Sequence, residues 1–289
     1  MRLAPGRLAP ALFLSMLAAA SLAEDPPPPP KPRALTDIEK KVLDKVNSYR
    51  KAAGLKDVSM DVELSGACQK HADYLVTNYT RQKSEGKTGV DEIEGRAGFT
   101  KEGQKAGLSS AVHYVEPVLS VEELMGTFGN RVAFLQANLE RIGLGVANGS
   151  NPAWYVVIDT RSGLTGAWAD PFVLYPGDKQ MNVPPLMKPG SQNPIPADKD
   201  GRAGFPITVC FKRSDTIANA KGTLKDAKGK EVAIWLVAPE TSAEAKELRT
   251  IGIIAQDPLD RGVTYTAWFE ADVNGAKLSK TWTFSTGKK

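Results

Sequence analysis

Cysteine and histidine are scarce in this sequence, with two of each among 289 residues. Two cysteines cannot provide the disulfide framework that stabilises many small exported domains, so ordinary hydrophobic cores have to hold the chain together. Cys68 and Cys210 each lie in an apolar pattern of a different predicted domain. Their positions favour two small buried hydrophobes, and the alternative of a disulfide between them stays open.

Long apolar runs and clusters of one charge are also missing. Lys and Arg number 37, Asp and Glu number 33, and the two kinds are interspersed. Nucleic acid is therefore not expected as a partner, because no basic face recurs along the chain. No apolar run reaches the roughly 20 residues that a membrane-spanning helix requires, so no transmembrane segment is expected in the mature protein.

The first residues have the pattern of a secretory signal peptide. Arg2 and Arg7 form a short positive region, Leu8–Leu17 is apolar, and small residues lead up to Ala23. This order predicts a signal peptide over residues 1–23, cleaved near Ala23. A membrane anchor is the alternative, but the apolar stretch is too short to cross a bilayer. We therefore expect a secreted or periplasmic protein.

Composition divides the rest of the chain into four segments. Residues 24–35 are a proline-rich tether, 36–169 carry helical and hairpin patterns, 170–204 are dense in Pro and Gly, and 205–287 alternate apolar with polar residues. The Pro/Gly-dense stretch predicts a linker, and the alternation predicts six or seven short strands. We expect an α+β domain followed by an all-β sandwich.

The α+β segment begins with helical signals. Thr36 and Glu39 form a capping-box pattern, and the apolar stripe that follows predicts a helix ending at Gly54. Asp61 begins a second helix with its own apolar stripe. Residues 80–107 are polar and without periodicity, which predicts a long loop.

The acidic residues of that loop are Asp91, Glu92 and Glu94. They could bind a cation such as calcium, but they lack the regular spacing of a calcium-binding loop. We therefore expect a solvated acidic loop.

Three further patterns complete the organisation. A second capping box predicts a short helix over 120–128, and two apolar runs around a turn predict a β-hairpin over 141–159. Near the C-terminus, residues 258–265 resemble a tyrosine-corner turn, in which the phenol oxygen of Tyr265 would pin the edge of the sandwich.

Six short motifs follow one another in a recognisable order. They are Asn47-x-x-Arg50, Gly54-Leu55, Asp61-x-x-Leu64 leading to His71-Ala72, Gly98-Phe99-Thr100-x-x-Gly103, Asn130-Arg131-x-x-x-Leu135, and Ile142-Gly143-Leu144-Gly145-Val146-Ala147. Over residues 36–160 this order resembles the CAP superfamily (SCP-like extracellular domain) of bacterial type. The resemblance implies a CAP-like α-β-α sandwich. Residues 205–287 resemble the bacterial Ig-like modules that are appended to exported proteins.

The resemblance breaks down at the metal site of the family. Many CAP domains carry two His and two Glu in a central cleft, which can bind a divalent metal. In this chain Asn130 stands where a histidine would precede Arg131, residues 78–89 contain no histidine, and residues 106–109 lack the family's glutamate. We therefore expect no metal and no cofactor, since zinc needs about four converging donors.

The candidate cleft residues are His71, His113, Glu122, Glu123, Asn130 and Arg131. His71 lies on the apolar stripe of the second helix, which favours a hydrogen-bonded structural role. His113 follows the long loop and could line the cleft, although a structural role is the commoner one for a lone histidine. Ser109 and Ser110 precede His113, but they lack a Gly-x-Ser-x-Gly turn and an acid partner, so no catalytic residue is predicted.

These features favour an exported, non-catalytic binding or structural protein with a degenerate CAP-type cleft. Its ligand would be an extracellular or envelope protein, glycan or lipid. The sequence speaks more against an enzyme than for one. The alternatives are an extracytoplasmic hydrolase acting on peptide or cell-wall material through His71 or His113 with a glutamate, and a lipid-binding module with an apolar groove.

Overall fold

The computed structural model describes residues 34–166, 168, 170–188, 194–196 and 202–288. The predicted signal peptide and all but the last two residues of the proline-rich tether lie outside the described residues. Residues Pro32–Lys289 group as one compact unit. Among the described helices, none combines the length and the apolar character needed to cross a bilayer.

The predicted capping box starts the first helix, α1 (Asp37–Ala52). The Thr36 hydroxyl oxygen accepts a hydrogen bond from the Glu39 amide, and the Glu39 carboxylate accepts one from the Thr36 amide. Both bonds satisfy amides that the helix itself leaves unpaired. After α1, Gly54 adopts a φ of +74°, which confirms the predicted end of the helix.

The predicted loop at 80–107 is shorter in the structure, because helices enter it at both ends. The second helix, α2 (Val62–Ser84), begins at its predicted cap Asp61 and runs past residue 80, and α3 (Lys101–Ser109) occupies the other end. Good helix formers such as Arg81 and Lys83 extend α2, although its solvent-facing end shows no apolar stripe. Thr100 caps α3 by accepting a hydrogen bond from the Gly103 amide.

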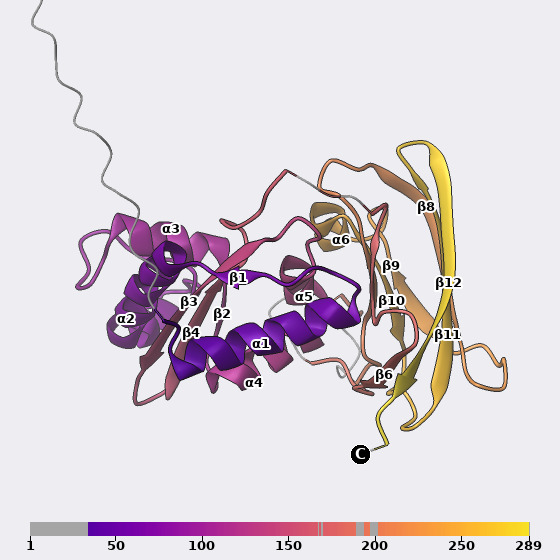
Figure 1. Ribbon diagram of the computed structural model, residues 1–289, viewed down its shortest axis with the longest axis horizontal. Coiled ribbons are helices and arrows are strands. Elements are labelled where there is room, and N and C mark those ends of the chain that lie inside the picture. Colours follow the sequence, from indigo (N-terminus) through magenta and orange to yellow (C-terminus); the bar gives the residue numbers. More distant parts are fainter. Residues whose placement is uncertain (1–33, 167, 169, 189–193, 197–201, 289) are drawn as a thin grey trace, which may run out of the picture. The chain divides into compact units, whose positions relative to one another are not determined.

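Helices pack on both faces of the first sheet, whose strand order is β1-β3-β4-β2. The strands are β1 (Ser59–Met60), β2 (Ser110–His113), β3 (Arg141–Asn148) and β4 (Trp154–Asp159). Along β4, Tyr155 and Val157 pack in a core with α2, whereas Val156 and Ile158 join the core that contains α1 residues. Figure 1 shows α2 and α3 on one side of this sheet and α1 with α4 (Pro117–Gly126) on the other.

Glycines let helix α2 lie directly on β3. A Cβ atom at Gly145 would come within 2.2 Å of the Cys68 backbone, and one at Gly143 within 2.6 Å of the Leu64 backbone. Such distances are too short for any side chain, so the Ile-Gly-Leu-Gly-Val-Ala motif is explained by close helix–strand packing.

The C-terminal part contains two four-stranded sheets, ordered β5-β7-β10-β9 and β6-β12-β11-β8. The strands are β5 (Val173–Tyr175), β6 (Gln180–Val183), β7 (Ile207–Cys210), β8 (Ile217–Lys225), β9 (Ile234–Val237), β10 (Thr250–Ala255), β11 (Thr264–Val273) and β12 (Ala276–Thr286). A short helix, α6 (Ala243–Leu248), precedes β10. Apolar residues of both sheets pack in one core, and the Phe211 and Phe269 rings meet at 6.1 Å. Figure 1 shows β11 and β12 as the longest hairpin of this part. The mixed helices and sheets confirm an α+β protein.

Two of these strands differ from the sequence expectation. β5 and β6 lie inside the stretch 170–204 that we expected to be a linker, and each pairs at the edge of a sheet. Strands this short show no alternation that could be detected, and the prolines around them are tolerated at edges. The tyrosine corner is as predicted, because the Tyr265 oxygen accepts a hydrogen bond of 2.8 Å from the Asp260 amide.

Candidate functional site

The structure divides the six candidate cleft residues among three places. His113 and Asn130 line one cavity, Glu122 and Glu123 line another, and His71 and Arg131 are buried in the interior.

The cavity that contains His113, here called the His113 cavity, has a volume of about 370 Å³. It lies between strand β2, the loop before α3, and the junction of α4 with α5 (Phe128–Phe134). Its lining residues are Thr88, Gly89, Val90, Ser110, Ala111, Val112, His113, Tyr114, Leu124, Thr127 and Asn130. Two of the six candidate cleft residues, His113 and Asn130, therefore line the same cavity.

His113 presents an unsatisfied nitrogen in this region. The side chain is half-buried, and its Nδ1 atom is buried without a hydrogen-bond partner in the part of the chain that is described. Burial lowers the pKa of His113 below its ordinary value, and the nearby negative charge of Glu123 opposes that shift. The imidazole is therefore biased toward its neutral form, in which one ring nitrogen donates and the other accepts.

Asn130 stands where the resemblance to CAP domains implies a histidine. It lies in the first turn of α5, where its backbone N–H donates to the Thr127 hydroxyl at 3.2 Å. The lining of the His113 cavity contains no carboxylate and no imidazole except His113. Within the described ranges, no three His, Cys, Asp or Glu side chains converge as metal ligands would. The donor set therefore does not fit the metal site of the family.

His71 is fully buried and does not line the His113 cavity with its side chain. Its Nδ1 lies 2.9 Å from Glu92 Oε1, and its Nε2 donates to the Gly89 carbonyl oxygen at 2.8 Å. Glu92 also accepts from the Thr100 amide at 3.0 Å, which ties α2 to the start of α3. His71 is therefore hydrogen-bonded on both ring nitrogens and more completely buried than its apolar stripe led us to expect.

Glu92 corrects the expectation of a solvated acidic loop. Only 4% of its surface is exposed, because its carboxylate lies against His71 and α3. A buried carboxylate is tolerated when its oxygens are hydrogen-bonded, as they are here. Asp91, by contrast, accepts local hydrogen bonds from Thr88 in a solvent-exposed turn.

Arg131 also lies outside the cleft. Its guanidinium is fully buried, donates to the carbonyl oxygens of Thr127 and Pro206, and stacks over Phe205 at 4.2 Å. Burial lowers its pKa to about 10. The Asn-Arg motif therefore places an arginine between α5 and the start of the C-terminal strands, where it connects the two parts of the core.

Glu122 and Glu123 each face a lysine. Glu122 pairs with Lys45, and Glu123 pairs with Lys188 at 2.7 Å. Both residues line a smaller cavity of about 150 Å³ that shares no lining residue with the His113 cavity. Both carboxylates are therefore engaged in ion pairs with lysines.

The serine and cysteine side chains near β2 form no nucleophilic site. The Ser110 hydroxyl lies 3.9 Å from the Cys68 sulfur, and no hydrogen bond links it to His113 in the described region. Burial raises the pKa of the Cys68 thiol to about 12 and that of Cys210 to about 11. Both cysteines are free and buried, so the structure favours small hydrophobes over a disulfide.

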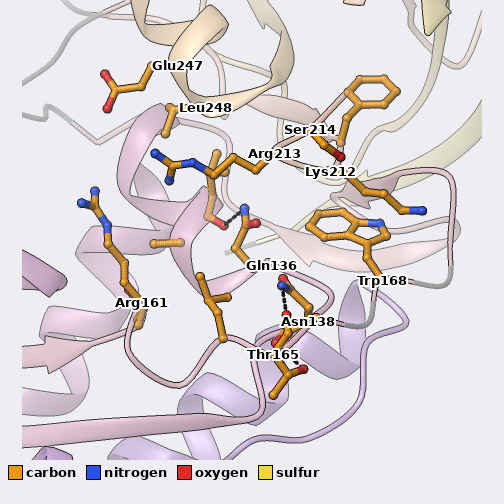
Figure 2. Close-up of a pocket in the computed structure, with 16 residues that line it drawn as sticks. Gln136, Asn138, Arg161, Thr165, Trp168, Lys212, Arg213, Ser214, Glu247 and Leu248 are labelled. Carbon is orange, nitrogen blue, oxygen red and sulfur yellow. Dashed lines mark hydrogen bonds between the residues drawn. The ribbon is translucent and has the colours of Figure 1, made fainter. Parts of the chain in front are cut away.

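Sequence reasoning missed a further cavity, which Figure 2 shows. Arg161, Trp168 and Arg213 contribute to its lining, which comes from four separate segments of the chain. No local sequence pattern predicts this cavity, because each of the four segments contributes only some of its lining residues.

Comparisons with known proteins bear on the N-terminal part. Residues 43–159 match the CAP family, described as the cysteine-rich secretory protein family, which supports a CAP/SCP domain there. A sequence comparison with curated proteins finds no significant match.

Two solved structures illustrate the structural likenesses. CopC from Methylosinus trichosporium OB3b shares 15% identity over 39% of this chain and 88% of its own, with a TM-score of 0.27. A DUF4426 family protein from Pseudomonas aeruginosa PAO1 shares 17% identity over 30% of this chain and 76% of its own, with a TM-score of 0.20. Likenesses this weak carry no argument about function.

Proposed function

We propose that this is an exported, non-catalytic binding protein that holds a polar ligand in the His113 cavity. The observation that carries the proposal is the lining of that cavity: one imidazole with an unsatisfied nitrogen, an amide and hydroxyls, and no carboxylate. The CAP match supports an extracellular binding role. Export through the signal peptide over residues 1–23, to the medium or the periplasm, and an Ig-like C-terminal module are parts of the same proposal.

The chemistry of the lining favours a neutral ligand. The His113 cavity has a volume of about 370 Å³, within the range of roughly 300–1,000 Å³ that is typical of small-molecule sites. Hydroxyls of Thr88 and Tyr114 and the Asn130 amide offer hydrogen bonds, but no side chain there carries a full charge at neutral pH. Glycan hydroxyls or peptide amides of the cell envelope have the matching chemistry.

Hydrolysis would require more groups than the cavity supplies. A nucleophile or an activated water needs a base within about 3.2 Å, usually oriented by a third group. His113 has no such partner in the described residues, and the carboxylate that contacts His71 is sealed in the core. A hydrolase is therefore the alternative that the experiment below must exclude.

Two uncharged probes test the proposal on the mature chain: the glycan chitotetraose and an end-capped neutral peptide. We expect at least one to bind by calorimetry, and His113→Ala or Asn130→Ala to weaken that binding about tenfold, the effect of one or two lost hydrogen bonds. Thr281→Ala, an exposed change on β12, serves as the matched control and should have no effect.

Mass spectrometry of the same samples decides between binding and catalysis. Intact probes together with binding support the proposal. Cleavage that His113→Ala abolishes would establish the hydrolase instead, and absence of binding by both probes would overturn the proposal. N-terminal sequencing of protein recovered from the medium or periplasm should begin near Glu24; an intact Met1 there would contradict export by cleavage.

A further inference from the structure

A second cavity, here called the basic cavity, has a volume of about 340 Å³. Four segments line it: the end of α5 with the turn after it, the loop after β4, the turn after β7, and the end of α6. The lining residues are Val132, Ala133, Gln136, Asn138, Thr160, Arg161, Leu164, Thr165, Gly166, Trp168, Phe211, Lys212, Arg213, Ser214, Glu247 and Leu248. This cavity is separate from the His113 cavity and shares no lining residue with it.

The charges of this lining are unbalanced. Arg161, Lys212 and Arg213 face one acidic residue, Glu247, and none of these four side chains forms an ion pair within the described part of the chain. Elsewhere several lysines and arginines are paired with carboxylates. Figure 2 shows the guanidinium groups of Arg161 and Arg213 on the same side of the cavity. Arg161 donates only a long hydrogen bond of 3.5 Å to the Leu108 carbonyl oxygen among the described residues. Guanidinium groups without an ion-pair partner in a concave site attract anions and can bind carboxylates through two parallel hydrogen bonds.

Ordered turns hold both arginines in place. Asp159 accepts hydrogen bonds from the amides of Arg161 and Ser162 at 2.9 and 2.8 Å, which fixes the turn after β4. Across the cavity, the Arg249 side chain donates to the Arg213 carbonyl oxygen at 3.2 Å. The arginine backbones are therefore positioned before any ligand arrives, which lowers the entropic cost of binding.

Among the residues that the structure describes, two buried polar atoms of this lining have no hydrogen-bond partner. The indole Nε1–H of Trp168 is an unsatisfied donor, and Asn138 Oδ1 is an unsatisfied acceptor. The Asn138 amide nitrogen is already used, since it donates to the Thr165 carbonyl oxygen. Hydroxyl groups both donate and accept, so a ligand rich in hydroxyls can satisfy both kinds of atom. The indole ring of Trp168 also offers an apolar face to a sugar ring.

We propose that the basic cavity binds an acidic saccharide, a hydroxyl-rich ligand that carries carboxylates. The carboxylates contact Arg161 and Arg213, and the hydroxyls contact Trp168 and Asn138. A neutral saccharide offers the arginines no carboxylate, and a simple dicarboxylate offers no hydrogen-bond donor to Asn138 Oδ1. This site is independent of the ligand proposed for the His113 cavity.

Three probes test this assignment by calorimetry on the mature protein at low ionic strength: digalacturonic acid, its uncharged dimethyl ester, and adipate, a dicarboxylate without hydroxyls. We expect digalacturonic acid to bind about tenfold or more tightly than either of the others, because each comparison removes one set of charge-assisted or neutral hydrogen bonds. Equal binding of the ester, or no binding of digalacturonic acid, would overturn the proposal.

Variants locate the site. Arg161→Gln and Arg213→Gln should each weaken the binding of digalacturonic acid about tenfold. Arg261→Gln removes an arginine that is also exposed but lies outside the cavity, and it should leave the affinity within about twofold. Equal losses of affinity in all three variants would mean that the overall charge of the protein governs binding, and would refute the site. Unchanged melting temperatures of the variants show that folding is intact.

An NMR titration gives a second readout that needs no variant of the arginines. Digalacturonic acid should shift the indole N–H resonance of Trp168, identified by its loss in Trp168→Phe. An indole resonance that stays in place at saturating ligand would place the binding elsewhere and overturn the assignment.

Discussion

At the scale of single residues, solvent exposure decides which of the predicted cleft residues can contact a ligand. His71 and Arg131 match the CAP-like motifs, whereas Asn130 departs from them, yet both are fully buried and each hydrogen-bonds to carbonyl or carboxylate oxygens. His113 has no motif of its own and nevertheless keeps an unsatisfied nitrogen in a region that borders a cavity. A sequence motif identifies the residue type at a position, whereas burial decides whether that residue can meet a ligand.

Zinc binding tests the donor set directly. A zinc site needs about four converging nitrogen, oxygen or sulfur donors, or three with water, and the His113 cavity offers one imidazole. We expect no stoichiometric zinc in the purified protein by elemental analysis. Added zinc should also leave the melting temperature unchanged, because only a ligand that binds the native state stabilises it. One tight calorimetric site that His113→Ala abolishes would contradict this prediction.

The titration of His113 should make stability depend on pH. Its pKa is lowered in the folded state by burial, so the unfolded chain binds a proton more readily than the native protein does. Stability should therefore be highest above the ordinary histidine pKa of about 6.5 and should fall as the pH drops below it. Urea unfolding of the wild type and of His113→Gln measures the free energy of unfolding at each pH. The pH range of about 8 to 5 spans the ordinary histidine pKa. The wild type should lose more stability than the variant, and parallel curves would contradict the shift.

At the scale of elements, the predictable features were those with strong local signals. The caps at Thr36 and Asp61, the hairpin of β3 and β4, and the corner at Tyr265 all occur where local patterns predict them. The edge strands β5 and β6 could not be predicted, because three or four residues between prolines carry no measurable period. The basic cavity could not be predicted either, since it exists only where four distant segments meet.

Glycine substitutions test why α2 can pack on β3. Gly145→Ala places a methyl group within 2.2 Å of the Cys68 backbone, so it should destabilise the protein by about 1–3 kcal/mol or more. Gly66→Ala is the matched control on α2 itself, where an added methyl meets nothing within 4 Å. That change should stabilise the helix by about 0.5–1 kcal/mol. Chemical denaturation measures both, and equal effects of the two variants would contradict the packing argument.

At the scale of the whole molecule, one hydrophobic core contains residues from both parts of the chain. Val42 and Ile158 of the N-terminal part belong to the same cluster as Ile207 and Phe269 of the C-terminal sheets. Arg131 bridges the two parts, because its partners include Thr127 on one side and Phe205 and Pro206 on the other. The predicted division at 170–204 therefore remains a proposal about folding that fragments can test.

Fragments that differ in their start point test where the second domain begins. We expect residues 170–289 to fold cooperatively and to resist denaturant better than residues 203–289. The shorter fragment lacks β5, which pairs with β7, and β6, which pairs with β12, so β7 and β12 become edge strands with one unpaired side. Equal denaturation midpoints for the two fragments would mean that residues 170–204 are a linker that adds nothing to stability.

A substitution of Arg131 tests how far the stability of the N-terminal part depends on contacts with the C-terminal part. In the full mature chain, Arg131→Ala leaves two carbonyl oxygens unsatisfied and opens space beside Phe205, which should cost about 2–4 kcal/mol. In a fragment of residues 34–169 the partners at 205 and 206 are absent, so the same substitution should cost less. Circular dichroism melts of both pairs give the comparison. If the cost is equal in the two backgrounds, Arg131 acts only within the N-terminal part; if residues 34–169 do not melt cooperatively, the two parts fold as one unit.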